Sequence, residues 1–105
     1  MMPGRTLSSV VALTLAASFS AHGETIQITM ENLVISPAEA SAKVGDTIEW
    51  INKDVFVHTA TARNGDWDVN LPAKKTGTLV LKKAGVIDYY CRLHPNMKAK
   101  LTVAP

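Results

Sequence analysis

Residues 78–103 read TLVLKKAGVIDYYCRLHPNMKAKLTV, and the spacing of apolar residues in this stretch decides the fold class. Apolar residues flank a break at residues 83–85, with Ile87, Tyr89 and Cys91 spaced two apart after it, and apolar and polar residues alternate after residue 97. A period of two is typical of strands that bury one face. The stretch therefore predicts a strand, a tight turn, a second strand that ends at the chain's single cysteine, a loop and a third strand.

The rest of the chain shows the same period of two, and no segment has the longer period of an amphipathic helix. Turn-forming residues recur about every 8 to 12 residues, which is typical of an all-β Greek-key sandwich or barrel of seven to eight strands. An immunoglobulin domain is the alternative, but the cysteine pair that marks it is missing from this sequence. We expect Trp50 in the core, Trp67 at the rim or surface, and a polar loop over residues 63–76.

The first 23 residues are interpreted as an export signal rather than as part of the fold. Arg5 supplies a positive charge, residues 7–21 are largely apolar and uncharged, and small residues lead up to position 24. A membrane anchor is the alternative, but about 15 such residues are fewer than the ~20 that a membrane-spanning helix needs. We therefore expect a cleaved signal peptide at 1–23, a single domain at 24–105 and no membrane span in the mature chain.

The charge balance and the cysteine count narrow the function. Arg5 is the one basic residue of the first 23, so the remainder keeps ten basic residues against nine acidic ones and a net charge near +1. Nucleic acid is therefore not a favoured partner. Cys91 has no second cysteine with which to form a disulfide within the chain. An unpaired cysteine in an exported protein indicates pairing between chains, a reactive thiol or metal binding.

Cys91 is followed by His94 and Met97, a C-x-x-H-x-x-M spacing. The alternation turns Cys91 and Met97 toward the same interior and places His94 in the loop between them. The only other histidine of residues 24–105 is His58, which ends the apolar run DVFVH, and the spare methionine, Met30, has a core position in the first strand. Two histidines and one cysteine with a weak methionine ligand form the ligand set of blue-copper sites. The few histidine, cysteine and methionine residues of the chain therefore predict a metal site of His58, Cys91, His94 and Met97.

Three other interpretations of these residues are weaker. An inert buried Cys91 with a hydrogen-bonded His58 leaves the C-x-x-H-x-x-M spacing unexplained. Zinc accepts two histidines and a cysteine, but it prefers a fourth nitrogen, oxygen or thiolate ligand to a thioether. Nucleophilic catalysis by a cysteine–histidine pair needs a third group that orients the histidine, and it has no use for Met97.

Residues 25–103 resemble a small cupredoxin, through VGDTIEWIN before the first histidine, HTAT around it and GVIDYYC before the second histidine. The loop CRLHPNM is similar in length and spacing to that of amicyanins. The resemblance implies that His58, Cys91, His94 and Met97 bind one copper ion. It further implies a monomeric, non-enzymatic, one-electron carrier of the bacterial periplasm, whose redox partners include an amine dehydrogenase and a c-type cytochrome.

A copper chaperone or storage protein is the alternative function, because it would use the same ligands but exchange the metal. Such proteins tend to carry extra methionines and histidines near exposed ends, and this chain has none to spare. A copper oxidase or nitrite-reducing enzyme needs additional histidines for a second copper site, which the chain also lacks.

The sequence departs from the family pattern beside two ligands. Thr59 stands where asparagine commonly ties the two ligand loops together, so we expect a weaker tether or a different one. Leu93 stands where proline is common, and its N–H is free to donate a second hydrogen bond to the Cys91 sulfur, beside that of Thr59. We also expect the ring edge of His94 at the surface as the electron port. The apolar patch expected around it consists of Phe56, Pro72, Leu93 and Pro95, and the expected basic rim consists of Lys53, Lys74, Lys75, Arg92 and Lys98.

Overall fold

The computed structural model describes residues 23–105, which form nine strands in two sheets. One sheet has the order β2 (Val34–Ser36), β1 (Thr25–Glu31), β4 (Thr47–Asn52) and β7 (Thr76–Val80). The other has the order β3 (Glu39–Lys43), β9 (His94–Ala104), β8 (Gly85–Cys91), β5 (His58–Ala62) and β6 (Asp68–Leu71). The predicted all-β class is confirmed. The predicted signal peptide lies outside the described residues except for Gly23.

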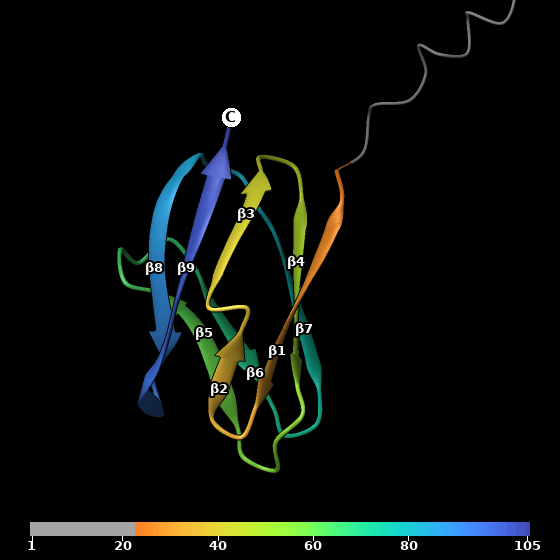
Figure 1. The fold of residues 1–105 in the computed structure, drawn as a ribbon, viewed down its shortest axis with the longest axis vertical. Helices are drawn as coiled ribbons and strands as arrows, with labels where there is room; N and C mark the ends of the chain where they lie inside the picture. The colour runs from red at the N-terminus through yellow and green to blue at the C-terminus, as the bar shows by residue number, and fades with distance from the viewer. Residues whose placement is uncertain (1–22) are drawn as a thin grey trace, which may run out of the picture.

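The two sheets face each other, and consecutive strands repeatedly change from one sheet to the other, as in a Greek-key sandwich (Figure 1). Strand pairing is parallel between β1 and β4 and between β3 and β9, and antiparallel in the other pairs. Four connections lie together at the lower end of Figure 1, opposite the C-terminus: β1–β2, β4–β5, β6–β7 and β8–β9. Within residues 23–105 no helix is long and apolar enough to cross a membrane.

The core follows the alternation of the sequence. Strand β9 buries Met97, Ala99, Leu101 and Val103 and exposes the residues between them, as predicted. Strand β8 buries Ile87, Tyr89 and Cys91. The two strands pair in register up to Tyr90 and Lys98, after which the register shifts by three residues so that Cys91 pairs with His94. This shift sets where the cysteine and the following histidine lie relative to each other.

Two local predictions were wrong. The interval 63–76 is not one polar loop, because residues 68–71 form β6 and pair antiparallel with β5. Trp67 is not a rim residue, because it is half-buried against the core and its ring centroid lies 5.4 Å from that of Trp50 and 5.4 Å from that of Tyr89. Trp50 is fully buried as predicted, and its Nε1–H donates to the Tyr89 hydroxyl at 3.1 Å. Burial raises the pKa of Tyr89 to about 12, although this hydrogen bond opposes the shift.

Candidate metal centre

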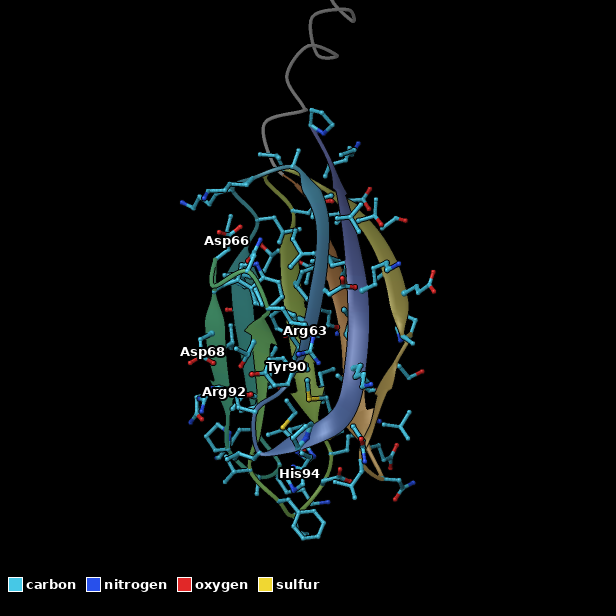
Figure 2. The ribbon with its side chains drawn as sticks, turned by 90° about the vertical axis from the view of Figure 1, so that its left-hand side faces the viewer. Arg63, Asp66, Asp68, Tyr90, Arg92 and His94 are labelled. Carbon is cyan, nitrogen blue, oxygen red and sulfur yellow. The ribbon has the colours of Figure 1, made fainter. Side chains whose placement is uncertain are left out.

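Three of the four predicted ligands meet at the lower end of the sandwich. His58 is the first residue of β5, Cys91 is the last of β8 and His94 is the first of β9. These three strands are neighbours in one sheet, so their ends bring the side chains together. His58 and Cys91 are fully buried, whereas His94 is half-buried and lies at the end of the molecule (Figure 2). The predicted exposure of the His94 ring edge agrees with this position.

The donor atoms of the three side chains fit one metal ion. His58 Nδ1 lies 3.2 Å from His94 Nδ1, and Cys91 Sγ lies 3.8 Å and 3.6 Å from these two nitrogens. The point equidistant from the three atoms is about 2 Å from each, which is close to the lengths of metal–nitrogen and metal–thiolate bonds. Three donor atoms thus surround one position with the spacing that a bound ion requires.

Asp54 orients the first of these histidines. Its Oδ2 lies 2.8 Å from His58 Nε2, and since an ionised carboxylate can only accept, this contact favours the tautomer with its hydrogen on Nε2 and a lone pair on Nδ1. Burial alone would raise the pKa of Asp54, but hydrogen bonds from His58, Leu33 and Asn32 outweigh it and lower the pKa to about 2. Asp54 was not predicted. The four-residue spacing of Asp54 and His58 in DVFVH is the one hint of this contact in the sequence. That spacing alone does not show that the two side chains meet.

The Cys91 sulfur accepts one backbone hydrogen bond among residues 23–105, from the Thr59 N–H at 3.4 Å. This bond was predicted. The prediction of a second bond, from the Leu93 N–H, was wrong. In the turn after Cys91, it is the Arg92 N–H that finds a partner across the site. That N–H donates to the Thr59 hydroxyl rather than to sulfur.

Thr59 ties the two ligand segments together. We expected a weaker or a different tether here, because Thr59 stands where asparagine is common in the family. Its Oγ1 accepts the Arg92 N–H at 2.9 Å and lies 2.9 Å from Thr61 Oγ1. Thr61 donates to Asp68 at 2.7 Å, and Arg92 Nε donates to the same carboxylate oxygen at 3.2 Å. The hydrogen bonds therefore form a closed ring that begins and ends at Arg92, and those from Thr61 and Arg92 lower the pKa of Asp68.

Figure 2 shows Arg92 beside Asp68 and, further up the sheet, Arg63 beside Tyr90. Tyr90 points away from the core, as expected for the residue before a buried cysteine, and the Arg63 guanidinium lies 4.1 Å from its ring centroid. This cation–π contact gives Tyr90 a structural role on the sheet surface.

Met97 lies on the buried side of β9 at the same end of the sandwich and is 2% exposed. Its neighbour Lys98 pairs with Tyr90, one residue before Cys91. Met30 is fully buried in β1 within the core, as expected for a methionine that fills space.

A sequence model of the cupredoxin-like domain matches residues 5–103. The chain belongs to the cupredoxin-like family. The match confirms the predicted family, and with the histidine–cysteine–histidine cluster it confirms copper as the cofactor.

Several known proteins are similar to this cupredoxin. It is 32% identical to amicyanin of Paracoccus denitrificans over 84 residues, which are 74% of this chain and 64%, just under two thirds, of that protein. It is 30% identical to the methylamine utilization protein MauL of Methylorubrum extorquens over 103 residues, 94% of this chain and 90% of that protein. The crystal structure of amicyanin from Paracoccus versutus superposes with a TM-score of 0.65 and 26% identity, covering 84% of this chain and 87% of that one.

Proposed function

We propose that this cupredoxin is a periplasmic one-electron carrier in which His58, Cys91, His94 and Met97 bind a single copper ion. The convergence of three donor atoms at one end of a rigid sandwich carries the proposal. When bound, copper supplies the chemistry by alternating between Cu(II) and Cu(I). The functional chain is residues 24–105, released by removal of the signal peptide and active as a monomer.

The protein's own part is to hold these donors still. Cys91 provides a thiolate, His58 and His94 provide imidazole nitrogens, and Met97 provides a thioether whose weak interaction tunes the potential. A site that serves both oxidation states works best when its ligands hardly move between them. The buried Asn52 supports this, because its side-chain amide donates to the carbonyls of Phe56 and Leu71 and so fixes the segment that leads to His58.

The surface around His94 suits brief docking with another redox protein. Phe56 lies with its ring centroid 6.0 Å from that of His94 and is 51% exposed. Its sequence neighbours Val55 and Val57 are also exposed apolar residues, and so is Leu93, which directly precedes His94. We call Val55, Phe56, Val57 and Leu93 the apolar end. It extends the predicted patch, whose remaining members Pro72 and Pro95 are exposed as well.

The partners follow from the likeness to proteins of methylamine utilisation. An amine dehydrogenase is the proposed electron donor and a c-type cytochrome the proposed acceptor. Lys53, Lys74, Lys75 and Lys98 are exposed and favour an acidic partner surface. Arg92 contributes less than expected to this rim, because its guanidinium is paired with Asp68.

Stopped-flow mixing of the reduced, copper-loaded protein with an oxidised c-type cytochrome tests this function. We expect electron transfer that Phe56→Asp slows by about tenfold, the effect of ~1.4 kcal/mol at one docking contact. Val86→Asp is the matched control, because Val86 is 62% exposed but lies near the start of β8, away from the metal centre. Absence of transfer, or equal slowing by both variants, would contradict the proposal.

A further inference from the structure

A buried carboxylate behind the metal centre joins it to a distant turn. Asp54 lies in the segment between β4 and β5 and is 9% exposed. Besides His58 Nε2, it accepts the backbone N–H of Asn32 on Oδ1 at 2.7 Å and that of Leu33 on Oδ2 at 3.0 Å. One side chain therefore connects a metal-ligand candidate with the turn between β1 and β2, more than 20 residues earlier in the chain.

The turn holds its two N–H groups in a fixed direction. Asn32 and Leu33 both have positive φ, 55° and 63°, as in the tight turns that connect antiparallel strands. Strands β1 and β2 pair on either side of it, and Lys53 N–H donates to the Met30 carbonyl next to it at 2.8 Å. The turn is thus fastened to the segment that carries Asp54.

Asp54 is also fixed from its own side. Its backbone N–H donates to Asn52 Oδ1 at 2.9 Å, and Asn52 is 1% exposed. Contacts on both sides, none of which involves His58, therefore fix the position of the Asp54 carboxylate. A hydrogen-bond acceptor placed this way determines both the orientation of an imidazole and the nitrogen that bears its hydrogen.

We propose that Asp54 is a positioning residue that keeps the His58 hydrogen on Nε2 and biases the copper site toward its oxidised state. The proposal rests on the proposed copper function. A carboxylate on the far nitrogen of an imidazole makes the other nitrogen a stronger donor. The more highly charged Cu(II) gains more from a stronger donor and from a nearby negative charge than Cu(I) does. The reduction potential is therefore held lower than it would be without Asp54.

The first test uses the metal-free protein and ¹⁵N NMR of the His58 ring. We expect a protonated Nε2 and an unprotonated Nδ1 in the parent protein, and a shift toward the other tautomer in Asp54→Ala. A parent protein with its hydrogen on Nδ1 would overturn the proposal, and so would an unchanged tautomer in the variant. The parent measurement decides the point even where the variant does not fold, and it does not depend on copper binding.

The second test is voltammetry of the copper-loaded protein. We expect Asp54→Asn to lower the ratio of Cu(II) to Cu(I) affinity about tenfold, which raises the one-electron potential by about 59 mV. Asp54→Glu should restore most of the potential, because it keeps a carboxylate.

Asp46→Asn is the matched control. Asp46 is 4% exposed and accepts the backbone N–H groups of Lys43 and Glu24 at the opposite end of the sandwich. Its loss should reduce stability and leave the potential unchanged. Equal shifts in the Asp54→Asn and Asp46→Asn variants, or none in the former, would overturn the proposal. A parent protein that binds no copper would instead refute the proposed function, while the NMR result would still stand.

Discussion

Replacing Thr59 by valine removes the hydroxyl that ties the two ligand segments together while nearly keeping the shape of the side chain. Thr59 is fully buried and its Oγ1 accepts the Arg92 N–H at 2.9 Å, so valine leaves that N–H without its partner. This bond is part-buried, so its loss costs about 1 kcal/mol, the net contribution of a typical hydrogen bond. For a domain of this size each kcal/mol lowers Tm by about 4–8 °C. We expect the metal-free Thr59→Val protein to unfold at least about 4 °C lower than the parent.

Urea unfolding of the metal-free protein measures this loss, and Thr59→Ser is the matched control because it keeps the hydroxyl and removes only the methyl group. Arg92 directly follows Cys91, so we also expect the visible spectrum of the copper-loaded Thr59→Val protein to shift, and that of Thr59→Ser to resemble the parent. If Thr59→Val is as stable as Thr59→Ser and has the parent's spectrum, the hydroxyl does not tether the ligand segments.

Three further predictions concern single residues. Cys91→Ser should abolish the intense visible absorption, which is thiolate-to-copper charge transfer, and should cancel the rise in Tm that copper gives the parent; persistence of the colour would remove Cys91 from the site. Leu93→Pro should leave the reduction potential unchanged, because the Leu93 N–H makes no bond to the Cys91 sulfur, and a lowered potential in cyclic voltammetry would show that such a bond exists. Asp46 has a pKa below its ordinary value of 3.8, because backbone N–H groups of Glu24 and Lys43 donate to it. The contribution of Asp46 to folding stability is therefore complete above pH 3.8 and is lost as the pH falls below it. The free energy of unfolding in urea should therefore depend less on pH below 3.8 in Asp46→Asn than in the parent. Equal slopes in the two proteins would contradict this.

The alternation of apolar residues predicted the strands that bury one clear face. In β9 the pattern from Met97 to Val103 is unbroken, and the structure follows it residue by residue. Strand β6 was missed because its four residues, DVNL, offer too short an alternation inside a polar stretch. The place of Trp67 was missed because its partners, Trp50 and Tyr89, lie 17 and 22 residues away and on different strands.

The convergence of His58, Cys91 and His94 was predicted because a small chain with few metal-binding residues leaves little choice of site. Apart from the Thr59 N–H bond to the Cys91 sulfur, the hydrogen bonds around that site were not predicted, because they depend on how separate segments meet. Asp54 binds N–H groups of a turn 21 and 22 residues before it, and Thr59 meets the backbone 33 residues after it. No periodic pattern in the sequence links residues at these separations, so neither contact could be inferred from it.

The visible absorption spectrum of the protein loaded with Cu(II) tests the central claim most directly. A copper ion held by the Cys91 thiolate together with His58, His94 and Met97 should make the protein intensely blue when oxidised and colourless after addition of one electron equivalent of reductant. A Cu(II)-loaded protein with only weak absorption, or one that keeps copper solely as colourless Cu(I), would contradict the electron-carrier account and favour copper transfer or storage.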